Sequence, residues 1–320
     1  GPVSEIRLGH NDGGGFASKF QLAAARAIVK ARRGRPFWLG GHLGWYTNNS
    51  GCLQLLGPKH FVEAGWRCHF ALSAARAEVQ RSAPCRRRPV PFSPSALTWG
   101  SVQGAMFRPN KVLSQHFAGL ARSVGYLATR PLLAAHVRRG DKTTNVYNRY
   151  HPGKSYALEA LHAAEELGLC RSSEAPCQLF VASDATSAKQ EVQEAVRALG
   201  ADWRVEVIGL ANSGSQRHSA VGVELARASL GVEAYSMAVE LLFDMEILSR
   251  ALVLVCTLAS QVARVAASLG TARGTMLRAV ALDIDNLPEM RALFSSFGIP
   301  VDDIPWRAPR IFGTLEEGVG

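Results

Sequence analysis

The sequence predicts an α/β protein with two doubly wound domains, in which helices cover a parallel sheet on both faces. From Pro131 onward, short apolar segments alternate with segments whose apolar residues recur at helical spacing, a pattern typical of βαβ units. A similar β-helix-β pattern opens the chain. A length of 320 residues is enough for two domains of ordinary size. We expect the domains to span residues 1–125 and 126–320.

The second half carries the more regular pattern. Its apolar runs predict strands because they are short and followed by polar or helical segments. We expect the last fifty residues to pack back on this half or to form an appendage. The expected strands are "LLAAHV", "CQLFVAS", "WRVEVI" and "LVLVCT", and the expected helices are Gly153 to Leu167, Thr186 to Leu199, Ala234 to Ser249 and Ser260 to Leu269.

The first half begins with a short apolar segment and the glycine-rich turn "NDGGGFAS", residues 11–18. Ser18 can cap a helix in which Phe20, Ala23 and Ala24 fall at helical spacing. Gly34 ends this helix and "PFWL" reads as the next strand. The middle of the chain, Cys52 to Pro109, predicts irregular structure.

Composition narrows the class of protein. Apolar content of 47% with charged content of 19% is typical of a folded globular protein. A net charge of +10 indicates an anionic partner without saying which. There is no basic stripe with interleaved aromatic residues and no zinc-finger spacing, so we expect no nucleic-acid partner. The six cysteines form no C-x-x-C pair, which argues against a zinc or redox site.

Two further features concern the cellular compartment. Cys170 and Cys177 flank "RSSEAP", a loop that a disulfide can close if the compartment is oxidising. The apolar run "LVLVCTLASQVA" has about 12 residues, too few to cross a bilayer as a helix. The chain begins with Gly-Pro, which resembles a protease scar. We therefore expect that an N-terminal targeting or anchor segment of the natural protein has been removed.

Polar side chains gather where the predicted strands end. Ligands bind at the carboxyl ends of the strands in open parallel sheets, so three separate clusters on one rim predict a binding site. The clusters are Arg138, Arg139, Asp141 and Lys142 after the first strand, Asp184 after the second, and Thr257, Ser260 and Gln261 after the last.

Each candidate has a functional and a purely structural interpretation. The paired arginines can grip a diphosphate, or form a salt-bridged surface. Asp244 is either an inward carboxylate that meets two N–H donors, as on a guanine edge, or a solvated helix residue. Ser260 either meets a phosphate or simply caps a helix. The glycine-rich turn can approach an anion or be a plain turn; no Asp or Glu occurs from Gly13 to Val62, which disfavours a dinucleotide-dependent dehydrogenase.

These motifs together resemble glycosyltransferase family 23, the core α1,6-fucosyltransferases, which are related to the rhizobial nodulation fucosyltransferase and to protein O-fucosyltransferases. The resemblance rests on "HVRRGDK" and "FDMEILSRALVLVCTLASQVARVA", supported by "NDGGGFASKFQLA", "WGSVQGAMFRPNKVL" and "LFVASDA", and runs with gaps from about residue 8 to 270. It implies a GT-B architecture of two Rossmann-like domains with the donor in the cleft between them. It also implies an inverting, metal-independent transfer of fucose from GDP-fucose.

The resemblance assigns roles position by position. Arg138 would hold the β-phosphate of GDP-fucose with Arg139 in support, and Lys142 would lie near the reacting centre. Four further positions complete the expected donor site: His136 and Asp244 would read guanine, and Ser260 would bind phosphate with Gln261 beside it. Gly13, Gly15 and the following backbone would approach the diphosphate, and Tyr46 would contact the nucleoside. No cofactor or metal is implied; the partners would be the GDP-sugar and a glycan or glycoprotein acceptor.

The sequence departs from the family at one position. Val146 stands where the family has its catalytic glutamate, and no Asp or Glu occurs between Asp141 and Glu159. An inverting transfer needs a base for the acceptor hydroxyl, so Asp141, Asp12 and Asp184 are the candidates. The alternatives are a transferase of another GDP-sugar, or a catalytically silent protein that binds GDP or glycan. The resemblance further implies the Golgi or secretory lumen, with membrane attachment only through a removed N-terminal anchor.

Overall fold

The structure is a computed structural model that describes part of the chain. The described residues are 4–8, 20–21, 23–26, 37–41, 100, 103–104, 107–139, 150–170, 176–200, 202–211, 213, 231–288, 292, 304 and 306–310. Among them, no helix is both long and apolar enough to cross a membrane.

A six-stranded parallel sheet forms the centre of the second half. Its strand order is β5-β4-β3-β6-β7-β8, the order of a doubly wound sheet in which the chain starts at the centre and winds out to both sides. The predicted α/β fold with a parallel sheet is therefore confirmed for this half. The strands are β3 (Leu132–Val137), β4 (Cys177–Ser183), β5 (Val205–Ile208), β6 (Val253–Cys256), β7 (Arg278–Ala281) and β8 (Trp306–Arg307).

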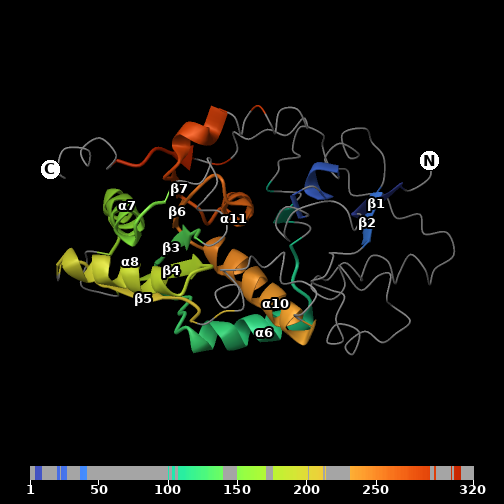
Figure 1. Ribbon diagram of the computed structural model, residues 1–320, viewed down its shortest axis with the longest axis horizontal. Helices are drawn as coiled ribbons and strands as arrows, with labels where there is room; N and C mark the ends of the chain where they lie inside the picture. Colours follow the sequence, from blue (N-terminus) through green and yellow to red (C-terminus); the bar gives the residue numbers. More distant parts are fainter. Residues whose placement is uncertain are drawn as a thin grey trace.

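Helices cover both faces of this sheet (Figure 1). Along β3, Leu132 and Ala134 belong to an apolar cluster shared with α6, α10 and α11. Leu133 and Ala135 belong to a second cluster shared with α7 and α8. This alternation is the period of a strand buried on both faces. The helices are α6 (Lys111–Ser123), α7 (Gly153–Glu166), α8 (Ser187–Ala198), α10 (Gly231–Leu248) and α11 (Gln261–Ala272).

The first half contributes a second, smaller sheet. Strand β1 (Ser4–Leu8) pairs in parallel with β2 (Phe37–Gly41), and residues 20–21 and 23–26 between them are helical. The predicted strand–helix–strand opening is therefore confirmed. Phe20 is fully buried in the cluster with α10 and α11, and its ring lies edge-on to that of Phe107 at 6.0 Å between centroids. A complete second Rossmann-like domain and a boundary at residue 125 stay predictions.

Two strands from the C-terminal fifty residues extend the sheet. Strands β7 and β8 add to the edge beyond β6, and a short 3-10 helix, Ile284–Asn286, follows β7.

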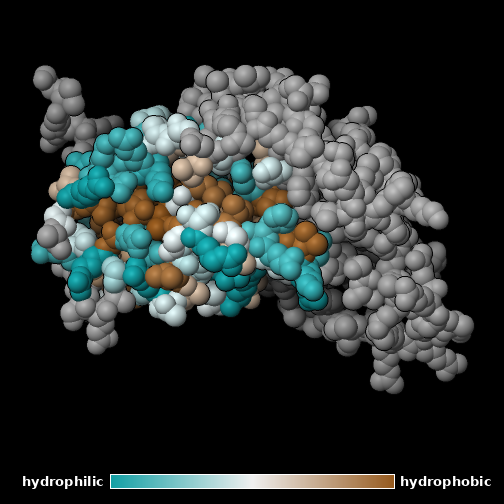
Figure 2. Space-filling model, turned by 90° about the horizontal axis from the view of Figure 1, so that it is seen from below, coloured by the Kyte–Doolittle hydropathy of each residue, from teal (hydrophilic) through white to brown (hydrophobic). Residues whose placement is uncertain are grey.

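Cys170 and Cys177 form the disulfide that the sequence allowed. Viewed from below, the described residues show a hydrophobic band edged by hydrophilic side chains (Figure 2).

Candidate functional site

At the centre of the sheet, between β3 and β6, the direction in which the chain winds changes. Strands β3 and β6 are hydrogen-bonded neighbours, yet the helix after β3 covers one face of the sheet and the helix after β6 covers the other. The helices that follow these two strands therefore lie on opposite faces of the sheet, and in open α/β sheets ligands bind at such a point. Arg138 and Arg139 follow β3, and residues 257–260 follow β6.

Asp184, directly after β4, fixes the arginine segment. One carboxylate oxygen of Asp184 pairs with the Arg138 guanidinium, and the other accepts the backbone N–H of Arg139 at 2.7 Å. Asp184 is buried, whereas the Arg138 side chain is 30% exposed. The guanidinium thus sits at the rim, is oriented by a buried carboxylate and stays partly exposed.

Arg139 makes a separate contact, in which its own side chain is buried. Its guanidinium donates to Glu191 Oε2 at 3.0 Å and lies 4.1 Å from the ring centroid of Tyr150. The same carboxylate oxygen accepts the N–H of Gly153 at 3.3 Å, at the start of α7. Burial alone would raise the pKa of Glu191, but hydrogen bonds from Ser187 and Arg139 outweigh it and hold that pKa below its usual value. Arg139 therefore links the end of β3 to α8 and, through Glu191, to the start of α7.

The loop after β6 presents the start of α11. Ser260 caps this helix, its hydroxyl oxygen accepting the Ala263 N–H at 3.4 Å, so the structural interpretation of Ser260 is confirmed. The first N–H groups of an α-helix have no partner inside it and favour anions. Gln261, the first residue of α11, is partly exposed beside this end.

His136 and Asp244 lie on the same side of the sheet. His136 follows the alternation of Leu132 and Ala134 and so faces the α10 layer. Asp244 is on α10, next to Phe243, whose ring packs against Phe180 of β4 at 6.0 Å. Both residues are buried, and His136 Nδ1 and Asp244 Oδ1 make no hydrogen bond.

Burial perturbs both groups strongly. Desolvation, with a smaller contribution from the Arg138 charge, lowers the pKa of His136 to about 3, so the imidazole is neutral at physiological pH. Desolvation and then the Glu240 carboxylate raise the pKa of Asp244 well above its usual value. Buried polar atoms without partners are rare and costly, and groups perturbed in this way mark candidate binding sites.

Five of the predicted site residues lie outside the described part of the chain: Gly13, Gly15, Tyr46, Asp141 and Lys142. So do Asp12 and Val146. Sequence reasoning missed three residues that shape the site: Glu191, Asp283 and Arg264. Asp283 follows β7 as Asp184 follows β4, so recognising β7 would have found it. An arginine inside the apolar stretch "QVARVA" was the signal for Arg264.

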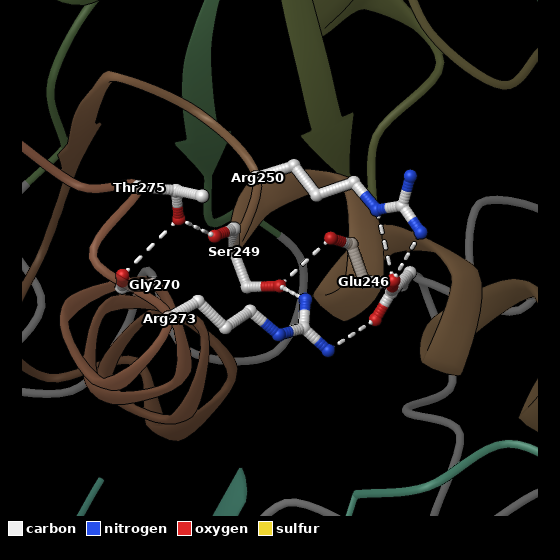
Figure 3. A network of polar contacts seen from close by, with 6 residues as sticks. All are labelled: Glu246, Ser249, Arg250, Gly270, Arg273 and Thr275. Atoms are coloured by element: carbon white, nitrogen blue, oxygen red, sulfur yellow. Dashed lines mark hydrogen bonds and ion pairs between the residues drawn. The ribbon is translucent and has the colours of Figure 1, made fainter. Parts of the chain in front are cut away.

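The opposite edge of the sheet holds a contrasting polar network (Figure 3). Glu246 receives the Arg250 guanidinium at 2.7 Å and the Arg273 guanidinium at 2.8 Å. Arg273 also donates to Ser249 Oγ at 2.5 Å, and Thr275 Oγ1 donates to the Ser249 carbonyl at 2.8 Å. These contacts join the C-terminal ends of α10 and α11. Both Glu246 oxygens have partners, so we interpret this network as structural.

Comparison with solved structures gives two groups of similar proteins. A POFUT1 structure in complex with GDP is 10% identical with a TM-score of 0.46, covering 88% of this chain and 98% of that one. A fucosyltransferase NodZ structure from Bradyrhizobium is 13% identical with a TM-score of 0.44, covering 88% and 94%. The chain is similar to fucosyltransferases. No protein-family model and no curated protein sequence matches it.

Proposed function

We propose that the chain transfers L-fucose from GDP-fucose to a hydroxyl of a glycan or glycoprotein, in an inverting, metal-independent reaction of the α1,6 type. One observation carries the proposal. Two buried polar atoms without hydrogen bonds, His136 Nδ1 and Asp244 Oδ1, lie on one side of the sheet, whose carboxyl edge carries Arg138 and the N-terminus of α11. In a nucleoside diphosphate, the polar base would contact His136 and Asp244. The anionic diphosphate would contact Arg138 and the start of α11.

The buried pair supports guanine as the base. Guanine presents N–H donors on its edge, including its exocyclic amino group, and a carboxylate is the side chain that accepts from such donors. Asp244 supplies that acceptor with a buried oxygen that has no hydrogen-bond partner in the protein. Neutral His136 has a ring nitrogen that can form a hydrogen bond with another atom of the base. Because its pKa is low, the imidazole carries no positive charge beside the base.

The rim supports the diphosphate. Arg138 offers a charged fork of donors, and the start of α11 offers backbone N–H groups and the positive end of a helix dipole. As the sugar departs, negative charge grows on the β-phosphate, and these groups stabilise it without a metal ion. Lys142, outside the described residues, would add charge near the reacting centre.

The acceptor hydroxyl needs a base. Both oxygens of Asp184 are engaged with Arg138 and with the Arg139 N–H, which suits an orienting role. We therefore favour Asp141 or Asp12, both outside the described residues, over Asp184 as the base.

We also infer that the enzyme works in the secretory lumen, since a disulfide such as Cys170–Cys177 forms and persists in an oxidising compartment.

Arg138→Ala tests the proposal. We expect transfer from GDP-fucose to fall by about 10²–10³ in kcat, because one electrostatic donor to the leaving group is lost. Arg130→Ala is the matched control, since Arg130 pairs with Glu206 at 2.7 Å near the opposite edge of the sheet; its turnover should match wild type. Near wild-type turnover in Arg138→Ala would defeat the mechanism.

A panel of GDP-sugars, assayed for transfer and for donor hydrolysis, separates the alternatives. Turnover with a different GDP-sugar would change the donor but keep the nucleotide site. Binding of GDP with neither transfer nor hydrolysis would identify a silent homologue, which Val146 at the family's glutamate position would explain.

A further inference from the structure

The peptide between Leu258 and Ala259, in the loop after β6, is held by two charged side chains from different elements. Asp283, just after β7, accepts the Leu258 N–H at 2.5 Å and the Ala259 N–H at 3.0 Å, one with each carboxylate oxygen. The Arg264 guanidinium, from α11, donates to the Leu258 carbonyl. Both backbone polar groups of Leu258 are therefore bound by side chains.

Both of these charged residues are buried. Asp283 is 7% exposed and Arg264 is 9% exposed, and desolvation lowers the pKa of Arg264 to about 10 although the Asp283 charge opposes this shift. Arg264 also reaches Gln21 Oε1 at 3.5 Å, on the helical segment of the first half. Burying a charge costs free energy unless its hydrogen bonds are well placed. A loop that only reverses the direction of the chain can be built from ordinary turn residues, at a lower cost in free energy.

The held peptide controls the geometry of the helix start. Ser260 donates its N–H to the Thr257 carbonyl at 3.1 Å, which closes the short turn around Leu258 and Ala259. Fixing that peptide therefore fixes the orientation of Ser260 and of the first N–H groups of α11. Asp283 also occupies the two amides before Ser260, so only the amides at the start of the helix remain to meet an anion.

We propose that Asp283 and Arg264 are positioning residues that pre-orient the β6–α11 loop for the diphosphate of the nucleotide. This inference rests on the proposed function, because it assumes a nucleotide bound at this edge. Neither residue touches the ligand; each acts through the Leu258 peptide. Gln21 extends the same contact to the first half, so the loop is held from both parts of the chain.

The test compares Asp283→Asn with Glu246→Gln. Both remove one buried carboxylate charge with little change of shape, but Glu246 belongs to the network at the opposite edge (Figure 3). GDP affinity is measured by titration calorimetry, and hydrogen exchange is measured for residues 257–261 without ligand. We expect Asp283→Asn to raise the Kd for GDP at least about tenfold, because an amide cannot accept both N–H groups. Exchange at 257–261 should also become faster. Glu246→Gln should change neither, while both variants lose thermal stability.

Arg264→Lys is the second variant, in case Asp283→Asn does not fold. Lysine keeps the charge and loses the planar fork, so a smaller rise in Kd and in local exchange is expected. A Kd within about twofold of wild type, in a variant whose local exchange is faster, would overturn the positioning role. Exchange that rises equally in Glu246→Gln would show a global effect and would also overturn it. If wild type binds no GDP, the proposed function fails, and the exchange comparison alone decides whether these residues order the loop.

Discussion

Asp244 is the residue at which stability and function are most directly opposed. Its carboxyl group is buried and Oδ1 makes no hydrogen bond, so the folded protein favours the protonated form and the pKa is raised. Above the usual pKa of an aspartate the unfolded chain carries this group ionised, whereas the folded chain holds the proton more tightly. The group therefore lowers stability at neutral pH, a cost that a guanine-binding role explains.

Asp244→Asn should be more stable than wild type and bind GDP less tightly. An amide needs no proton on folding, so we expect the melting temperature at pH 7 to rise by roughly 2–6 °C. The amide nitrogen cannot accept from guanine, so the Kd for GDP should rise at least about tenfold. Calorimetry measures both quantities, and the exposed Asp202→Asn is the control. A variant that is less stable, or that binds GDP as wild type does, would contradict this assignment.

At the scale of elements, α7 and α8 pack so closely that one position requires glycine. Gly153 begins α7, and its N–H donates to Glu191 of α8 at 3.3 Å. A Cβ atom built on Gly153 would lie 2.5 Å from the Glu191 Cβ and 2.9 Å from its carbonyl carbon. Glu191 also binds the Arg139 guanidinium. The packing of α7 against α8 therefore sets the position of Arg139.

Gly153→Ala should therefore destabilise the protein, by about 1–3 kcal/mol, because the two helices must move apart. Gly119→Ala is the matched control: Gly119 lies within α6, and nothing stands within 4 Å of its added Cβ. That change should stabilise by up to about 1 kcal/mol, since alanine favours a helix. Urea unfolding measures both, and equal effects of the two substitutions would refute the close-packing argument.

Elements with a clear apolar pattern were predictable from the sequence, and the contacts between them were not. β3, β4 and β6 were recognised because each is a run of buried residues on both faces. The short strand β7 was missed because four residues, "RAVA", carry too little pattern. The rim at Arg138 and Asp184 followed from the rule on strand ends. Glu191 did not follow from that rule because it lies within α8 and not at a strand end, and Asp283 did not because the strand before it, β7, was missed.

At the scale of the whole molecule, pH acts through groups that titrate differently in the folded and unfolded chains. His136 has its pKa lowered from 6.5 to about 3, and Glu191 has its pKa lowered from 4.5. In both cases the unfolded chain binds protons more readily, so their contributions are present above the unfolded pKa and are lost as pH falls. Asp244 acts in the opposite direction, because its pKa is raised.

Comparing wild type with His136→Gln isolates one of these contributions. As the pH falls from 6.5 to about 3, the free energy of unfolding of wild type should decrease relative to that of the variant, by about 1.4 kcal/mol per pH unit. Above pH 6.5 the difference should be constant. Chemical unfolding at a series of pH values gives this difference, in which Asp244 and Glu191 cancel. A difference that does not change with pH would show that His136 titrates normally.

The apolar cluster beneath α10 and α11 has a consequence for how the chain can be divided. It includes Phe20 from the first half and Leu113 and Phe117 from α6, and Arg264 meets Gln21 there. A fragment cut at the expected boundary near residue 125 would leave these aromatic and charged surfaces facing water. The second half is therefore not self-sufficient, because part of its interior comes from the segment that precedes it.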